Sequence, residues 1–280
     1  MSFHSVTCPR GTRYGFPLKK QGYHTSVMTA RWMRLGLGLM CLLGAVTARA
    51  SVSEDVPALK YFPLFKGSVW TYEGPATWTV ADSNGEVRQE RLTFRMEVTE
   101  TYQRGPIWLA MLHGHPLDAV FYEQGKAPSR TAYLCVGYQV YELNEQRAVE
   151  ALRRLQNAND HLGDLVQVED LAFDFPLLSG KRFGGPPDQI TREDGWYQWA
   201  VLGPAESASG SQPVSADEVE LRYSSVPDET RIRFKKGEGI AGCDYVHHGT
   251  ISEVHLTLTS FQQGAPHPSP TLIQNPSGEK

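Results

Sequence analysis

Cysteine is scarce in this sequence, and three common catalytic signatures are absent from it. The 280 residues include 4 cysteines, too few for a disulfide-dense scaffold. No G-x-S-x-G, H-E-x-x-H or P-loop sequence occurs. The glycine run Gly237-Glu-Gly239-Ile-Ala-Gly242 precedes an expected strand rather than a helix, so it predicts a bulge or tight turn and not a phosphate site. With 40% hydrophobic and 21% charged residues, the chain is neither fibrous nor wholly disordered.

Acidic residues are absent from the first 50 positions, and the first acid is Glu54. This front segment carries seven basic side chains: Arg10, Arg13, Lys19, Lys20, Arg31, Arg34 and Arg49. Residues 51–280 keep 20 of the 27 basic groups and all 31 acidic groups, a net charge of −11. An acidic body repels phosphate backbones, so we expect no nucleic-acid partner.

The front segment has the layout of a signal peptide. Arg31 and Arg34 precede an apolar run over residues 35–46, and Ala48-Arg49-Ala50 then forms an A-x-A cleavage pattern. A run of this length is too short to span ~30 Å of hydrocarbon. We expect a signal peptide over 28–50, cleavage near Ala50, a periplasmic or secreted product without a stable membrane span, and an upstream extension, 1–27, that is not native.

Two cysteines, Cys135 and Cys243, remain after the expected cleavage. An oxidising compartment allows them to pair, and such a bridge would add ~4 kcal/mol on the chain-entropy model. The alternative is two separately buried thiols that act as small hydrophobes. Neither lies in a C-x-x-C sequence, so a redox or zinc-knuckle role is not expected.

Apolar and polar residues alternate along several segments of the mature chain. Leu92, Phe94, Met96 and Val98 alternate with polar residues, as in a half-buried strand, and follow a hairpin turn over 82–85. Further expected strands cover residues 132–140, 219–223, 232–234 and 254–258. Strands this dense, joined by Gly, Pro, Asn and Asp, indicate an antiparallel sheet.

One segment, 144–158, predicts a helix that covers an open end of the sheet. Asn144 can cap it, an apolar stripe runs from Ala148 to Leu155, and Glu150 can pair with Arg154. Residues 205–215 read as a long hairpin loop. The proline-rich tail, 262–280, is expected to be disordered.

A short internal repeat predicts the architecture. Residues 62–70 read FPLFKGSVW and residues 175–183 read FPLLSGKRF, an offset of 113. Gly67 and Gly180 would each permit a tight turn before an aromatic that opens a strand. We expect one mainly β domain over 51–261, a curved antiparallel sheet, open barrel or sandwich. Its two related halves would cover about 60–170 and 171–261.

Three segments resemble a known class of proteins: YFPLFKGSVWTYEG, FDFPLLSGKRFG and FKKGEGIAGCDYVHHGTISEVHLTLTSF, all within residues 60–261. The resemblance is to bacterial secreted proteins without assigned activity, in which an FPL-x-x-G-x-x-W segment follows the signal peptide. It implies an exported, mainly antiparallel β protein with a curved sheet like those of lipoprotein carriers. It supplies no catalytic residues, and the helix Asn144–Leu155 is a departure from the pattern.

The histidines offer the one candidate metal set. His113 and His115 are two apart and would share a face of a strand, while Asp244 and His247 lie near the chain's end. These four could hold zinc if the two segments met. Otherwise they are hydrogen-bonded turn residues, and no cofactor is expected.

Three functions remain open. We favour a non-enzymatic exported protein that binds a lipid or other apolar or extended ligand on the concave face of the sheet, in a cleft beside the helix. Tryptophans such as Trp70, Trp108 and Trp199 would line that surface or simply fill the core. The alternatives are a metal-assisted hydrolase that uses the histidines and an envelope assembly component that works through sheet edges.

Overall fold

A computed structural model describes residues 56–80, 83–120, 127–157, 159–160, 162–188, 192–204 and 217–266. The expected upstream extension, the expected signal peptide, the expected 205–215 loop and most of the tail lie outside these residues. Among the described residues, no helix combines the length and apolarity that crossing a membrane requires.

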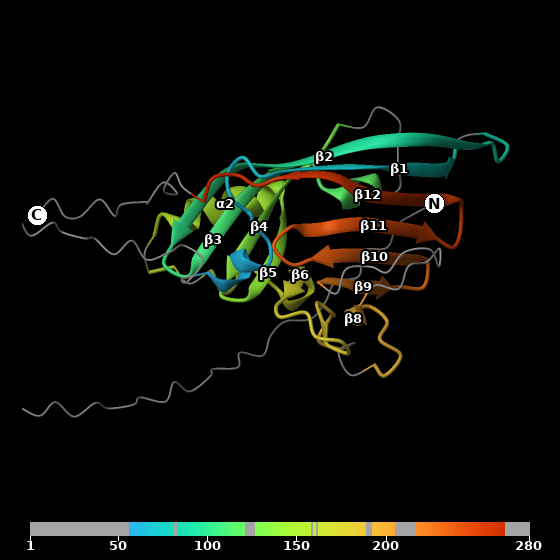
Figure 1. Ribbon diagram of the computed structural model, residues 1–280. Coiled ribbons are helices and arrows are strands. Elements are labelled where there is room, and N and C mark those ends of the chain that lie inside the picture. The colour runs from blue at the N-terminus through green and yellow to red at the C-terminus, as the bar shows by residue number, and fades with distance from the viewer. Residues whose placement is uncertain are drawn as a thin grey trace, which may run out of the picture. The chain divides into compact units, whose positions relative to one another are not determined.

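The described chain forms one antiparallel sheet of twelve strands and a single α-helix, which confirms the mainly β prediction (Figure 1). The strands are β1 Val69–Thr79, β2 Val87–Arg104, β3 Ile107–His113, β4 Arg130–Val136, β5 Gln139–Asn144, β6 Leu171–Asp174, β7 Arg182–Phe183, β8 Trp199–Pro204, β9 Glu218–Ser224, β10 Asp228–Lys235, β11 Gly239–His247 and β12 Ser252–Gln262. The helix is α2 Glu145–Leu155, and three short 3₁₀ helices are η1 Pro57–Lys60, η2 Pro116–Ala119 and η3 Val168–Asp170.

The strand order shows two consecutive meanders. It runs β6-β5-β4-β3-β2-β1-β12-β11-β10-β9-β8-β7, so each half contributes six strands in sequence order. The first strand of one half, β1, pairs with the last strand of the other, β12, from Val69↔Gln262 to Trp78↔Ser252. The equivalent strands at the other end of each half, β7 and β6, are not paired with each other and form the two free edges of the sheet. The sheet is therefore a nearly closed barrel with one joined seam and one open seam.

The glycine turn of the repeated sequence has the same conformation in both halves. Gly67 and Gly180 both have φ 82°, a conformation that favours glycine. Gly67 N–H donates to the Val98 carbonyl at 2.8 Å, and Gly180 N–H donates to the Val201 carbonyl at 2.8 Å. The two halves therefore share this turn and its hydrogen bond to a neighbouring strand. The sixth strand of the first half ends at Asp174, slightly later than the expected break at residue 171.

The interior is filled by aromatic side chains around Phe62. This fully buried ring lies 5.6 Å from Trp70 on β1, 5.4 Å from Tyr133 on β4, 5.7 Å from Phe173 on β6 and 5.6 Å from Phe234 on β10. Strands from across the sheet meet on one side chain, so the sheet curves around it. The segment that the repeat identifies is the plug of the barrel.

The expected helix is present, and it covers the outer face of β3, β4 and β5 rather than an open end of the sheet. The Asn144 side chain caps it by accepting a hydrogen bond from Arg147 N–H at 3.0 Å. Its buried face packs on outward-facing strand residues in a second apolar cluster, which includes Ala148, Ala151, Leu155, Leu109, Ala132, Leu134 and Leu143. Alternate β4 residues point to the barrel interior, so this strand is buried on both faces.

Two local predictions need correction. Residues 132–140 form a hairpin instead of one strand. Val136 pairs with Gln139 across a two-residue turn in which Gly137 has φ 61°. The sequence did not reveal the turn, because the alternation of apolar residues continues across it. Glu150 pairs with Arg153 at 2.7 Å. Arg154 instead pairs with Asp160, also at 2.7 Å.

The glycine run forms both of the features expected of it. Gly237 turns the chain with φ 81°, and the register slips between Arg233↔Gly242 and Phe234↔Ile240, which marks a bulge in β11. Gly239 also permits close packing, because a Cβ there would lie 2.4 Å from the Phe62 ring. The glycine run therefore makes room for the plug.

Candidate functional site

The four candidate metal ligands are not brought together. His113 is exposed at the end of β3, and Gly114 turns the chain with φ 75°, so His115 does not follow it along a strand. Asp244 bonds to His255 at 2.9 Å, while His247 bonds to Asp228 at 2.7 Å. Among the described residues, no group of three or more His, Cys, Asp or Glu could hold a metal ion. The metal-site prediction is therefore wrong for this geometry.

The two cysteines are separate buried thiols and not the disulfide considered for them. Cys135 lies on β4 and Cys243 on β11, with four strands between them in the sheet order. Burial raises the pKa of both thiols, that of Cys243 to about 12. Both therefore stay protonated and act as core residues.

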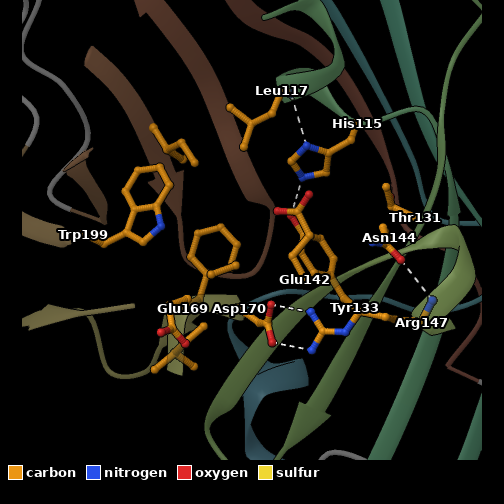
Figure 2. Close-up of a pocket in the computed structure, with 14 residues that line it drawn as sticks. His115, Leu117, Thr131, Tyr133, Glu142, Asn144, Arg147, Glu169, Asp170 and Trp199 are labelled. Atoms are coloured by element: carbon orange, nitrogen blue, oxygen red, sulfur yellow. Dashed lines mark hydrogen bonds and ion pairs between the residues drawn. The ribbon is translucent and has the colours of Figure 1, made fainter. Parts of the chain in front are cut away.

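A cavity of about 320 Å³ opens beside β4, β5 and β6. Its lining residues are His115, Leu117, Thr131, Tyr133, Glu142, Asn144, Arg147, Glu169, Asp170, Leu171, Ala172, Phe173, Trp199 and Ile232. Figure 2 shows Glu142 beside Tyr133 and His115, Asp170 facing the Arg147 guanidinium, and Trp199 on the opposite side. The wall is polar on the β4–β5 side and aromatic on the β8 side.

His115 and Tyr133 form a buried pair whose proton positions follow from their contacts. Leu117 N–H donates to His115 Nδ1 at 3.1 Å, so this nitrogen carries no proton. Nε2 then carries the proton of the neutral ring and donates to the Tyr133 hydroxyl. Burial, followed by the nearby Glu142 carboxylate, raises the pKa of Tyr133 well above its usual value. The Tyr133 hydroxyl therefore stays protonated.

Strand register sets Glu142 and Thr131 next to this pair. Tyr133 is opposite Glu142, and Thr131 is opposite Asn144, so all four project from one face of β4 and β5. Within the described residues, the Glu142 carboxylate has no hydrogen bond or ion pair, and Thr131 Oγ1 is buried without a hydrogen-bond partner. The Glu142 carboxylate and the buried Thr131 hydroxyl are thus both left without a partner in the wall of the cavity.

Arg147 and Asp170 are fully occupied with each other and with the backbone. The guanidinium donates to both Asp170 oxygens at 2.5 Å and also to the Leu165 carbonyl. Asp170 accepts a further bond from Gln167 N–H at 2.7 Å. Burial pushes the pKa of Asp170 up, but the bonds from Arg147 and Gln167 outweigh it and hold the pKa below its usual value. This pair closes one wall of the cavity, and the described lining residues include no other lysine or arginine.

A second cavity of about 420 Å³ adjoins the first and shares Leu117, Glu169 and Trp199 with it. Its other lining residues are Val120, Gly184, Pro186, Tyr223, Ser225, Asp228, Thr230 and Tyr245. Asp228 accepts hydrogen bonds from the Tyr245 hydroxyl at 2.6 Å and from the His247 ring at 2.7 Å. Its carboxylate is therefore already hydrogen-bonded within the protein.

We call these two adjoining cavities the seam groove. Their walls come from β6 on one side and from Gly184, just after β7, and Trp199 on β8 on the other. A Cβ on Gly184 would lie 2.5 Å from the Leu171 carbonyl, so the two free edges approach closely beside the groove. The groove is therefore a product of the open seam.

Among the candidate tryptophans, Trp70 and Trp108 are buried in the core, whereas Trp199 lines the groove. Tyr133 carries little sequence signal, because it lies in the run 132–140 that alternation assigns to one strand, and Glu142 lies just beyond that run. The usable signal was a glutamate two residues after Val140, on the inward face of a strand. A carboxylate at an inward position marks a polar wall.

Comparison with known proteins adds a distant structural neighbour. No family model and no curated protein matches this sequence. A solved structure of a provisionally assigned exported protein with a YmcC-like fold, from Bacteroides fragilis NCTC 9343, is 10% identical to this chain at a TM-score of 0.35. The alignment covers 72% of this chain and 98% of that chain.

Proposed function

We propose that this chain is an exported binding protein that holds an amphiphilic or extended ligand in the seam groove. The observation that carries the proposal is the pair of adjoining cavities, about 320 and 420 Å³, beside the open seam. Together they are of the size of small-molecule sites, which combine apolar and aromatic walls with a few placed polar groups. The position of the groove supports entry of a ligand between the two free edges.

The aromatic side of the groove supports an apolar ligand body. Trp199 lies between the two cavities, 5.5 Å from the Tyr223 ring, and Leu117 contributes to both walls. The concave face of the sheet is not available for this role, because Phe62 and its neighbours fill it. The cleft expected beside the helix is likewise occupied by the second apolar cluster. The proposal therefore moves the ligand from the concave face to the seam.

Binding can be tested with N-phenyl-1-naphthylamine, an uncharged probe whose fluorescence rises in apolar sites. We expect saturable binding, and we expect Trp199→Ala to weaken it about tenfold, since aromatic contacts contribute ~0.5–1.5 kcal/mol beyond their buried area. The matched control is Trp196→Ala, which removes a tryptophan from the same segment that lines neither cavity. An equal loss in both variants, or no saturable binding, would contradict the proposal.

Export is proposed from the sequence, from its resemblance to bacterial secreted proteins, and from the basic flank, apolar run and A-x-A site. The test is to express the full chain in a Gram-negative bacterium, fractionate the cells and sequence the N-terminus. We expect a periplasmic product that begins at Ser51. A cytosolic product that retains residues 28–50 would contradict export.

A further inference from the structure

We infer that the polar end of the seam groove is a headgroup site for a primary ammonium, so that the preferred ligand is an amphiphile with an apolar body and a cationic amine. This inference rests on the proposed function, because it assigns the chemistry of one end of the same groove. It is carried by three neighbouring acceptors on β4 and β5: Glu142, Thr131 and Tyr133.

The hydrogen-bonding capacity of these residues matches an ammonium group. An ammonium presents three N–H donors. The Glu142 carboxylate and Thr131 Oγ1 are acceptors without a partner among the described residues. The Tyr133 hydroxyl uses one of its two lone pairs on His115 Nε2–H and keeps the other. Three acceptors on one face of two adjacent strands can therefore receive three donors.

The charge balance of the first cavity favours a cation over an anion. Among the described residues that line it, Glu142, Glu169 and Asp170 are acidic and Arg147 alone is a lysine or arginine. Arg147 and Asp170 neutralise each other, so Glu142 and Glu169 stay uncompensated. The positive end of α2 borders the cavity at Asn144, but the Asn144 side chain caps it. An anionic headgroup would meet two like charges and no free cation.

The His115–Tyr133 pair is held in place before a ligand binds. His115 and Tyr133 are 1% exposed, and Asp118 holds the backbone of His115 through a 2.9 Å bond to its N–H. Asp118 also accepts from Ser129 N–H at 3.0 Å, which ties the segment before β4 to the η2 turn. A site held by buried hydrogen bonds loses little conformational entropy on binding, so the headgroup contact is preorganised.

The test compares three probes with the same eight-carbon chain: octylammonium, octanol and octanoate. Displacement of N-phenyl-1-naphthylamine at neutral pH gives their relative affinities. We expect octylammonium to bind about tenfold tighter than octanol, and octanoate to bind most weakly, because hydrogen bonds to a charged acceptor are the strong ones. Glu142→Gln should abolish the preference for octylammonium over octanol.

The matched control is Glu253→Gln, which removes a carboxylate on β12 that lines neither cavity and should retain the preference. An unchanged circular dichroism spectrum and urea unfolding midpoint show that the Glu142→Gln variant is folded. If octylammonium binds no better than octanol, or if its preference survives Glu142→Gln, the headgroup inference is wrong while the groove stands. If the fluorescent probe itself does not bind, the proposed function fails first and the inference falls with it.

Discussion

At the scale of single residues, Phe62 joins core rings from both halves of the sheet. Its ring contacts Trp70, Tyr133, Phe173 and Phe234, which come from four strands of both halves. Phe62→Ala would leave a cavity that these rigid rings cannot fill. We expect a loss of about 3–5 kcal/mol in the free energy of unfolding, measured with urea. Leu178→Ala is the control: Leu178 is 62% exposed, so its loss should be within about 0.5 kcal/mol.

Asp170 makes a pH-dependent contribution through its ion pair with Arg147. Its pKa is lowered in the folded state, so its stabilisation is present above the unfolded-state pKa of about 3.9 and is lost as the pH falls through the folded value. Asp170→Asn should therefore cost ~1–3 kcal/mol at pH 7 and much less at a pH below the folded-state pKa of Asp170. Urea unfolding at both pH values measures this difference. An equal cost at both would show that the carboxylate charge is not the cause.

At the scale of elements, the repeated turn offers an internal comparison. Gly67 and Gly180 share φ 82°, and a Cβ on either would meet no atom within 4 Å. Alanine at each position should therefore cost only backbone strain, about 1–2 kcal/mol, and the same amount in both halves. Gly163→Ala, where the backbone is not left-handed and the space is equally open, should cost nothing. Unequal losses at Gly67 and Gly180 would show that the two turns are not equivalent.

The same elements show what the sequence could predict. The alternation around Met96 and the Asn144 cap mark local structure, because strand and helix periodicity depend only on neighbours along the chain. The repeat predicts the two halves because it preserves the residues that make the turn. The groove could not be predicted, because Glu142 and Trp199 are 57 positions apart and meet only when the two edges of the sheet approach.

At the scale of the whole described domain, the two seams are unequal although the halves are related. β1 and β12 each have eleven residues and are joined by a ladder along nearly their full length. At the other seam, β6 has four residues and β7 has two. Short edges cannot form a ladder of comparable length, so the barrel stays open where the groove lies. The groove proposed for binding thus lies where the symmetry of the fold is broken.

Amide hydrogen exchange can measure the difference in local stability between the open seam and the joined seam. Peptides that cover 171–174 and 182–183 should exchange at least about tenfold faster than peptides that cover 69–79 and 252–262, because free edges open with less energy than a paired ladder. Saturation with N-phenyl-1-naphthylamine should slow exchange at the open seam and leave the joined seam unchanged, since the groove contacts only the former. Protection that rises equally at both seams would place the ligand in the shared core, which Phe62 fills.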